Sequence, residues 1–352
     1  MDRAPNLLIV PTPPALADHT TIGVGGPADR WFVATSQDAL VGAIGSLDAA
    51  GTPILILGGG SNLLVADAGF RGTVVQVAVR GVEIEESESG IDLTVAAGES
   101  WDALVALTVA SGWTGLEALS GIPGLVGATP VQNVGAYGQE VGQAVTSVRV
   151  LDRQDGSIGV LTHDECRFGY RTSRFKDEPG RHVVLAVTMH LSPIGSGVVA
   201  YAELARALGV EVGDSAPIAE IREAVLGLRG TKGMVLDPKD SDTRSLGSFF
   251  VNPIVDEAIA AAIDPACPRY PAVTGVKLSA AWLIEHAGIG KGWRIEAQSP
   301  ARVSTKHTLA LTNTGDASTL DVLNLARAIR SAVQTRFGIT LEAEPRLVDC
   351  SL

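Results

Sequence analysis

The sequence predicts a chain of the α+β class. Strand-like apolar runs and amphipathic helical segments follow one another in a mixed order that does not fit a strict βαβ array. With 46% hydrophobic and 19% charged residues, the composition is that of a folded globular protein and excludes wholesale disorder. Its 352 residues are enough for two or three domains, each with its own core.

Hydrophobic periodicity predicts the main elements along the chain. Short runs of β-branched, aromatic and aliphatic residues, bounded by turn residues, predict strands at 31–33, 53–57, 73–77, 92–96 and 182–187. Apolar residues that recur at helical spacing predict helices at 37–50, 101–111, 216–229, 279–287 and 317–337. This mixed order of strands and helices fits the α+β class better than a strict βαβ array.

Composition excludes several classes of function. A net charge of −12 argues against a nucleic-acid partner, and no apolar stretch of about 18 residues is present that would insert into a membrane. The apolar run at 7–10 is too short for a signal peptide, so a cytoplasmic location is expected. Cys166, Cys267 and Cys350 lie too far apart in sequence for a metal-binding pair, and the histidines form no zinc-binding pattern, so no metal is expected.

Glycine is the compositional outlier, at 40 residues or about 11% of the chain against roughly 7% in average usage. The run Gly58–Gly60 follows an apolar strand and precedes Ser61 and Asn62. Successive backbone N–H groups without side chains form a nest that wraps a phosphate closely. A flexible hairpin turn is the alternative interpretation of this run.

A second glycine-rich segment covers residues 121–138 and contains the amide pair Gln132 and Asn133. Amide side chains can hydrogen-bond to the edge of a heterocycle, and the small residues around them let a flat ligand approach the backbone. The segment therefore predicts a nucleotide or cofactor loop, with a structural loop between strands as the alternative.

The segment 168–176 combines three cations and three aromatic residues in an acidic protein. A solvated basic turn would account for this composition. The functional interpretation is an anion site in which Arg171 presents a planar fork to a carboxylate or a developing enolate.

Two further segments contain candidates for proton chemistry. Ser248 lies between a glycine and two phenylalanines, where it is either a structural strand serine or a proton donor. Near the end of the chain, alternation over 341–346 predicts a strand with Glu342, Glu344 and Arg346 on one face. That strand would bring an acid and a cation into a site, unless it is a solvated tail.

Seven blocks in this order resemble one known family: TIGVGG at 21–26, LGGGSNLL, GIPGLVGATPVQNVGAYG, FGYRTSRFK, GSFFVNP, KLSAAWLIEHAG and the closing LEAEPR. They extend from about residue 20 to residue 346, nearly the whole chain. Together they resemble the UDP-N-acetylenolpyruvoylglucosamine reductase (MurB) family of peptidoglycan-precursor enzymes.

The resemblance implies an α+β chain with an FAD-binding fold of the vanillyl-alcohol-oxidase (PCMH) type and an additional α+β substrate-binding domain. The expected domains are residues 1–80, joined by a C-terminal strand at 338–352, as FAD-binding subdomain 1; 81–214 as FAD-binding subdomain 2; and 215–337 as a bridging helix and the substrate-binding domain.

The resemblance also implies a reaction in two halves. NADPH, the co-substrate, reduces the FAD cofactor and is replaced by UDP-N-acetylglucosamine enolpyruvate. Flavin N5 then delivers hydride to the terminal enolpyruvyl carbon, and protonation of the adjacent carbon gives UDP-N-acetylmuramate.

Residue roles follow from the matching blocks. Ser248 resembles the family's proton donor, and Arg171 and Glu344 resemble the groups that stabilise the enolic intermediate. The expected FAD contacts are Gly58, Gly59, Gly60, Ser61, Asn62, Gly121, Ile122, Gly124, Gly127, Ala128, Gln132, Asn133, Gly135 and Ala136. The expected substrate contacts are Tyr137, Tyr170, Tyr201 (as a residue that closes over the substrate), Lys232, Asn252, Lys277 and Arg346.

Two other functions are compatible with parts of this pattern. One is a flavin oxidase of the same superfamily that acts on an alcohol or a sugar acid. The other is a non-catalytic module that binds a nucleotide sugar. The trio Ser248, Arg171 and Glu344 argues against an oxidase, because hydride donation to an alkene needs a proton source.

Overall fold

The computed structural model describes residues 7–352, which form two compact units. Of the described residues, the first unit comprises 7–13, Ala28–Gly59 and Arg71–Gly230. The second unit comprises Pro14–Pro27, Gly60–Phe70 and Thr231–Leu352. Each unit is therefore assembled from segments that are distant in sequence.

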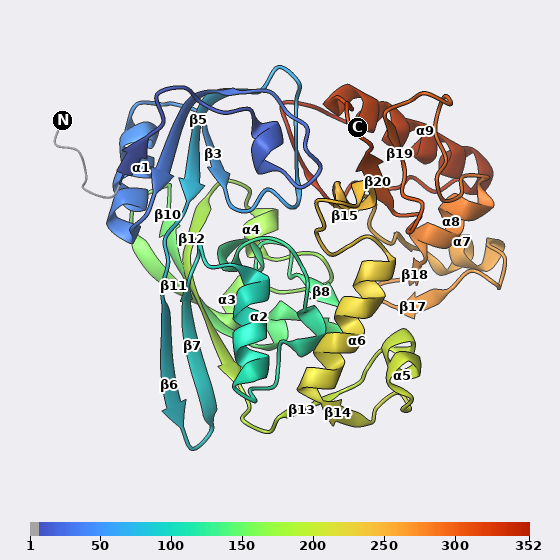
Figure 1. Cartoon of the computed structure of the whole chain (residues 1–352), viewed down its shortest axis with the longest axis horizontal. Coiled ribbons are helices and arrows are strands. Elements are labelled where there is room, and N and C mark those ends of the chain that lie inside the picture. Colours follow the sequence, from blue (N-terminus) through green and yellow to red (C-terminus); the bar gives the residue numbers. More distant parts are fainter. Residues whose placement is uncertain (1–6) are drawn as a thin grey trace. The chain divides into compact units, whose positions relative to one another are not determined.

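The first unit contains a mixed four-stranded sheet with the order β1-β2-β5-β3. Its strands β3 and β5 are labelled in Figure 1. Its strands are β1 (Leu7–Ile9), β2 (Ala28–Ala34), β5 (Phe70–Val77) and β3 (Ile54–Leu57). Helix α1 (Gln37–Ala49) connects β2 to β3 and begins where the Ser36 hydroxyl accepts a hydrogen bond from the Ala39 N–H. Strand β3 runs parallel to β5 and ends at the Gly58 loop.

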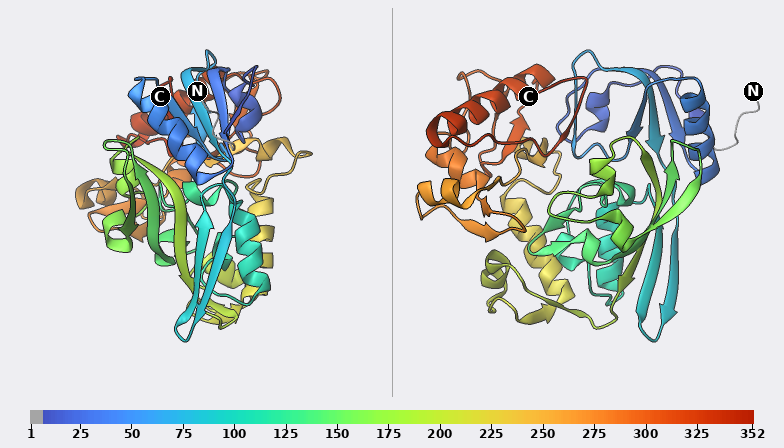
Figure 2. Two further views of the ribbon diagram at one scale, coloured as in Figure 1. Left: turned by 90° about the vertical axis from the view of Figure 1, so that its left-hand side faces the viewer. Right: turned by 180° about the vertical axis from the view of Figure 1, so that it is seen from behind.

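A five-stranded antiparallel sheet completes the main framework of the first unit, in the order β11-β10-β12-β7-β6. Its strands are β11 (Ile158–Thr162), β10 (Val145–Asp152), β12 (His182–Leu191), β7 (Gly90–Ala96) and β6 (Val82–Ser87). The β6–β7 hairpin protrudes at one end of this sheet (Figures 1 and 2). Consecutive residues of β7 and β12 pair across the ladder, and in β7 the buried residues Ile91, Leu93 and Val95 alternate with less buried ones.

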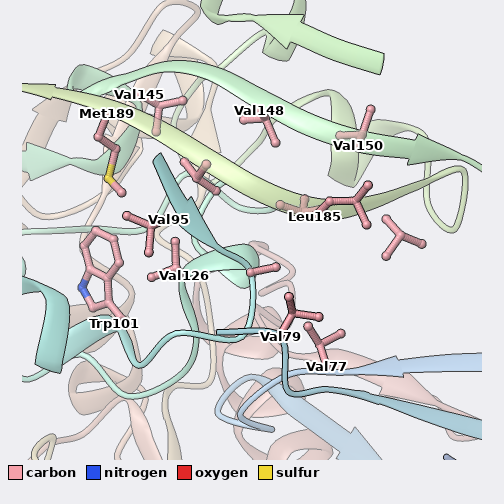
Figure 3. Close-up of a cluster of buried hydrophobic side chains, with 14 of the residues drawn as sticks. Val77, Val79, Val95, Trp101, Val126, Val145, Val148, Val150, Leu185 and Met189 are labelled. Carbon is pink, nitrogen blue, oxygen red and sulfur yellow. The ribbon is translucent and has the colours of Figure 1, made fainter. Parts of the chain in front are cut away.

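The core of the first unit lies between this sheet and helix α2 (Trp101–Ala110) (Figure 3). The Trp101 ring is fully buried among Val95, Val126 and Met189, and its Nε1 donates to the Leu119 carbonyl at 3.1 Å. Because the indole N–H is satisfied, the ring is buried without an unpaired donor. This packing holds the segment after α2, which leads into the glycine-rich loop.

The remaining elements of the first unit are short, except for one helix. They are η2 (Glu117–Leu119), η3 (Val126–Ala128), β8 (Gly135–Ala136), β9 (Gln139–Glu140), η4 (Val141–Gln143), α3 (His163–Cys166), α4 (Arg174–Asp177), β13 (Ser196–Val198), α5 (Ala202–Leu208), β14 (Ser215–Pro217) and α6 (Ile218–Thr231). Helix α6 buries Ile221 and Val225 against Val199 and Leu204, which forms a smaller separate core.

The second unit has a core of its own, centred on Phe249, Phe250 and the apolar faces of two helices. Its strands are β4 (Leu63–Val65), β15 (Ser245–Ser248), β16 (Ile254–Val255), β17 (Arg269–Pro271), β18 (Val276–Leu278), β19 (Ala301–Val303), β20 (Ala310–Asn313) and β21 (Arg346–Val348). Its helices are η1 (Leu16–His19), η5 (Ser241–Thr243), α7 (Glu257–Ala262), α8 (Ala280–His286) and α9 (Thr319–Phe337). The sheets have the orders β15-β20-β19, β16-β18-β17 and β21-β4.

All ten strands and helices predicted from periodicity are present, but the strand predicted over 341–346 is wrong in its bounds. Strand β21 begins only at Arg346, and Glu344 and Pro345 form a bend. Pro345 has no N–H to donate to a ladder, which explains why no strand includes it. Strand β21 pairs in parallel with β4 inside the second unit. The three-part domain division stays a prediction, and its residues 1–6 lie outside the described residues.

No helix within residues 7–352 is long and apolar enough to cross a membrane.

Candidate functional site

The two glycine-rich loops predicted to bind the cofactor lie against each other in the first unit. A Cβ atom added to Gly59 would lie 2.8 Å from the Cα of Gly124, and one added to Gly58 would lie 3.8 Å from the Leu125 side chain. Gly124 itself has a φ of +118°, which side chains disfavour. The two backbones can approach this closely only because neither Gly59 nor Gly124 has a side chain.

This arrangement fits a dinucleotide. Gly59 and Ala128 are exposed, so backbone without bulky side chains faces outward beside the contact between the loops. An extended diphosphate can lie along such a surface and accept hydrogen bonds from backbone N–H groups. The residues present are therefore suited to FAD.

Three predicted cofactor contacts of the second loop, Gly121, Ile122 and Gly127, also make contacts within the protein. The Gly121 N–H donates to Asp102 Oδ1 at 2.7 Å and is thereby occupied. Gly127 donates its N–H to the Ala97 carbonyl at 2.9 Å, and a Cβ there would lie 2.5 Å from the Ala97 side chain. Ile122 packs against the main core of the unit. These contacts fix the course of the loop.

Asn133 does not present a free amide edge, in contrast to the prediction from sequence. Its Nδ2 donates to Glu140 Oε2 at 2.7 Å and to the Gly169 carbonyl at 3.0 Å, and its Oδ1 accepts from the Gly142 N–H at 2.9 Å. Because the amide is buried and both its nitrogen and its oxygen are hydrogen-bonded within the chain, it holds the three residues that it contacts in a fixed arrangement. Asn133 thus ties the glycine-rich loop to the turn at Gly169, and its half-buried neighbour Gln132 remains the candidate for a heterocycle edge.

Arg171 lies at the tip of a two-residue turn. Gly169 and Thr172 exchange backbone hydrogen bonds of 3.0 and 3.2 Å, which leaves Tyr170 and Arg171 at the corner. The Arg171 guanidinium donates to the Gly135 carbonyl at 2.7 Å, and its Cζ lies 5.6 Å from the centre of the Tyr170 ring. The cation is thus held beside Gly135 and Ala136 of the glycine-rich loop.

Lys176 supports this turn, because its Nζ donates to the Arg171 carbonyl at 2.8 Å. The predicted cluster of cations is therefore partly structural.

Backbone strain gathers in the same region. Five described non-glycine residues have positive φ, and three of them, Asn133, Tyr137 and Arg171, belong to the predicted site. Left-handed backbone costs non-glycine residues free energy, and such residues cluster where function requires a fixed geometry.

Tyr137 and Tyr201 meet in the first unit. Their rings pack edge to face with centres 5.7 Å apart, and Tyr201 precedes helix α5 with an exposed side chain. Burial raises the pKa of Tyr137 to about 12. The phenol therefore remains neutral and able to donate a hydrogen bond at physiological pH.

Sequence reasoning missed Arg229, a buried arginine of α6. Burial lowers the pKa of Arg229 to about 10, while the charges of Tyr137 and Asp102 oppose that effect. Its position was visible in principle, because Arg229 falls four residues after Val225 on the apolar stripe of the helix. A charged residue on such a stripe indicates a special environment.

In the second unit, Ser248 ends strand β15 immediately after a β-bulge. Ser245 pairs with Thr312 and Ser248 with Ala310, so β15 has one residue more than its partner between these pairs. Gly247 accommodates the bulge with a φ of +71°. Bulges of this kind redirect the next side chain, and Ser248 is partly exposed while Phe249 and Phe250 are buried.

The Ser248 hydroxyl makes no hydrogen bond to any residue of the described part of the chain. It is thus available to a ligand.

The C-terminal segment runs alongside the Ser248 motif. The Glu344 N–H donates to the Phe249 carbonyl at 2.9 Å, and the Val251 N–H donates to the Glu342 carbonyl at 3.1 Å. Glu344 is therefore fixed beside the residue that follows Ser248.

The same segment contacts the end of the first glycine run. Asn62 Nδ2 donates to the Glu344 carbonyl at 3.3 Å, and the Arg346 N–H donates to the Asn62 carbonyl at 3.0 Å. Ser61 precedes Asn62 in the same turn, and Gly60 accepts from the Thr21 N–H at 3.3 Å. The second unit thus brings together Gly60, Ser61, Asn62, Ser248, Glu344 and Arg346.

The other predicted substrate contacts have varied surroundings. Asn252 Oδ1 accepts from the Ala280 N–H at 2.9 Å, which caps helix α8. Lys277 Nζ lies 5.8 Å from the centre of the Tyr270 ring, and Lys232 follows the end of α6. Asn252 therefore has a structural function whatever it contacts besides.

Among residues 7–352, no group of three or more His, Cys, Asp or Glu side chains is placed to hold a metal ion.

Comparison with known proteins gives matches over nearly the whole chain. A family model described as FAD binding domain matches residues 28–162, and one described as UDP-N-acetylenolpyruvoylglucosamine reductase, C-terminal domain, matches residues 237–348. Together with the fold, the first match confirms the predicted α+β FAD-binding architecture.

Relatives named UDP-N-acetylenolpyruvoylglucosamine reductase are similar at high identity. The one from Cutibacterium acnes is 52% identical and covers 96% of this chain and 90% of its own length. The one from Nocardia farcinica is 55% identical, with coverages of 96% and 89%. The crystal structure of UDP-N-acetylenolpyruvylglucosamine reductase (MurB) from Thermus caldophilus is similar with a TM-score of 0.65 and 28% identity, over 97% of this chain and 99% of that one.

Proposed function

The chain belongs to the UDP-N-acetylenolpyruvoylglucosamine reductase family, and from this premise we propose that it reduces UDP-N-acetylglucosamine enolpyruvate to UDP-N-acetylmuramate with NADPH. This reaction belongs to the synthesis of peptidoglycan precursors. The observation that carries the proposal is the placement of Ser248 on a bulge, with an unengaged hydroxyl, beside the Glu344 segment. FAD, when bound, would supply the hydride chemistry by accepting hydride from NADPH and passing it to the enolpyruvyl group.

Ser248 donates the proton in this proposal. A hydroxyl is a weak acid, so it transfers a proton only to a strong base such as an enolate and must be resupplied by a neighbour or by water. The Gly247 bulge and the buried Phe249 fix the direction from which Ser248 acts. A positioned acid of this type contributes typically 10²–10⁴-fold to a rate.

Arg171 stabilises the negative charge that develops on the substrate. Its hydrogen bond to the Gly135 carbonyl orients the guanidinium before the substrate arrives, so little reorganisation is needed during the reaction. Loss of one such preorganised donor in other enzymes costs roughly 3–4 kcal/mol of barrier. Glu344 assists the same charge when it is protonated or paired with a cation.

The remaining assignments concern binding. Backbone from Gly58 to Asn62 and from Gly121 to Ala136 holds the cofactor, and Lys232, Lys277 and Arg346 suit the diphosphate and carboxylate of the substrate. Tyr137, Tyr170, Tyr201 and Asn252 supply further substrate contacts. The edge-to-face packing of Tyr137 and Tyr201 supports the role of Tyr201 as a residue that closes over the substrate. When Tyr201 closes, its ring moves against the ring of Tyr137, which it already contacts.

The test is a turnover assay with the purified protein, NADPH and the enolpyruvyl sugar, followed by mass spectrometry of the nucleotide sugar. We expect one NADPH consumed per product, and a product heavier than the substrate by two hydrogen atoms. An oxidase of the same superfamily would instead consume oxygen with an alcohol or sugar acid and ignore NADPH. A flavin-free protein that only binds the UDP-sugar would contradict the proposal as well.

A further inference from the structure

Asp102 joins three parts of the first unit with one carboxylate. It belongs to the first turn of α2, and its Oδ1 accepts from the Gly121 N–H at 2.7 Å. The same carboxylate receives both arms of the Arg222 guanidinium, at 2.7 Å to Oδ1 and 3.1 Å to Oδ2. Helix α2, helix α6 and the first residue of the glycine-rich loop are thereby connected.

The Asp102 carboxylate is in the charged form that a stable ion pair with Arg222 requires. Burial alone would raise the pKa of Asp102, but the hydrogen bonds from Arg222 and Gly121 outweigh it and hold the pKa below its ordinary value. The carboxylate is therefore ionised at physiological pH. A bidentate bond between arginine and carboxylate also fixes the relative orientation of its two partners.

We propose that Asp102 and Arg222 are positioning residues for the FAD site, which set the course of the loop from Gly121 to Gly124. This inference rests on the proposed contact between FAD and that loop. Gly124 lies against Gly59, so the direction in which the chain leaves Gly121 determines where the two glycine loops meet. Asp102 touches no ligand in this account and acts through the backbone.

The Asp102–Arg222 ion pair also affects the position of Arg229, because Arg222 and Arg229 belong to the same helix, α6. Arg229 lies seven residues after Arg222, two turns along the helix, and interacts electrostatically with both Asp102 and Tyr137. The Asp102–Arg222 bond therefore holds the helix that presents Arg229 toward Tyr137. The Asp102–Arg222 ion pair thus positions both the glycine-rich loop at 121–124 and the helix that carries Arg229 beside Tyr137.

The experiment measures the affinity of the folded apoprotein for FAD by the change in flavin fluorescence on binding. Asp102→Ala removes all three hydrogen bonds and should weaken FAD binding about tenfold or more. Arg222→Gln leaves the bond to Gly121 and should weaken it less, and Arg222→Lys less again. Thermal unfolding of each apoprotein establishes that the variants are folded.

A matched control is available in the same unit. Asp48 and Arg153 form another bidentate pair, with bonds of 3.0 and 2.5 Å, which connects α1 to the end of β10 away from either glycine loop. Asp48→Asn should lower stability while FAD affinity stays within about twofold. Gly59→Ala, which places a Cβ 2.8 Å from Gly124, should weaken FAD binding and so tests the loop assignment directly.

The outcomes separate the inference from the proposed function. If Asp102→Ala and both Arg222 variants bind FAD like the native protein while Gly59→Ala does not, the positioning role is wrong and the loop assignment stands. If Gly59→Ala also binds normally, the loop assignment and the inference fall together. Neither result depends on NADPH or on the enolpyruvyl sugar, so failure of the proposed reaction is seen separately. Should Asp102→Ala not fold, the Arg222 variants decide the question.

Discussion

Ser248 shows how much a single side chain depends on its neighbours. The hydroxyl is left unengaged by the described chain because the bulge at Gly247 turns it away from the regular ladder, while Phe249 and Phe250 anchor the backbone in the core. A serine hydroxyl is a weak acid, so its contribution to the rate depends on how closely it is positioned beside the carbon that receives the proton.

Replacing Ser248 by Ala should separate the two half-reactions. Reduction of the flavin by NADPH should remain within about twofold of the native rate, while reoxidation by the enolpyruvyl sugar should slow by about 10²–10⁴-fold. Rapid-mixing absorbance measurements of each half-reaction provide the test.

Ser279 is the matched control, because its hydroxyl caps α8 in the same unit. Ser279→Ala should lower stability by about 1 kcal/mol and leave both half-reactions unchanged. Equal losses in both half-reactions of the Ser248 variant would contradict the assigned role.

Tyr137 provides a prediction about pH. Its pKa in the folded protein is raised to about 12 from the ordinary 10.0, so the folded state holds the phenolic proton more tightly than the unfolded state. The stabilisation is complete below pH 10 and is lost as pH rises towards 12. A titration of tyrosinate absorbance should show a late step near 12 that disappears in Tyr137→Phe. Disappearance of a step near 10 instead would contradict the assigned burial effect.

Single residues also show where sequence reasoning fails. Asn133 has the right residue type for reading a heterocycle, yet its amide is engaged by Glu140, Gly142 and Gly169. Which hydrogen bonds an amide makes depends on segments that are distant in sequence, and a motif does not contain that information. Arg229 was overlooked for the same reason, since its environment is created by Tyr137 and Asp102.

At the scale of elements, strand β15 combines a regular ladder with one extra residue. In a regular antiparallel ladder that continued from the Ser245–Thr312 pair, Ser248 would lie opposite Leu309, whereas the bulge places it opposite Ala310. Gly247 was the only sign of this in the sequence, because its φ of +71° is readily adopted only by glycine.

Gly247→Ala should therefore affect catalysis more than stability. The left-handed φ would cost alanine about 1–2 kcal/mol, and no described atom lies within 4 Å of the added Cβ. If the strand relaxes by removing the bulge, Ser248 changes direction and the second half-reaction slows like that of the Ser248→Ala variant. Circular dichroism and urea unfolding measure stability alongside the half-reaction rates. A variant that loses stability but keeps its full rate would show that the bulge does not direct Ser248.

Most regular elements followed from local patterns, and the exceptions have local causes. The predicted helices appeared because each buries an apolar stripe, as α1 does with Leu40, Ile44 and Leu47. The strand predicted at 341–346 failed because Pro345 interrupts the ladder, so β21 begins only at Arg346. The hydrophobic pattern predicted which side chains are buried, but not which backbone groups of 341–346 form the hydrogen bonds of a strand.

At the scale of the whole molecule, segments from both ends of the chain combine in one unit. Pro14–Pro27 and Gly60–Phe70 belong with Thr231–Leu352, and Asn62 hydrogen-bonds to Glu344. Local patterns do not show such long-range pairing. The ordered motifs of the family indicated which residues share a site, and the structure shows which of them share a unit.

FAD binding should stabilise the molecule by mass action. Free FAD at a hundred times its Kd should add about 2.7 kcal/mol to the free energy of unfolding relative to the apoprotein. Thermal unfolding at increasing FAD concentrations should therefore show a rising midpoint, accompanied by slower hydrogen exchange at 121–136. A midpoint independent of FAD concentration would contradict the assignment of those loops to the cofactor.

The most direct test of the proposed function is an anaerobic titration of the flavin absorbance in the native protein. NADPH should bleach the bound flavin, and the colour should return only when UDP-N-acetylglucosamine enolpyruvate is added, with UDP-N-acetylmuramate as the product. A flavin that NADPH does not bleach, or that stays bleached after the enolpyruvyl sugar is added, would contradict the account.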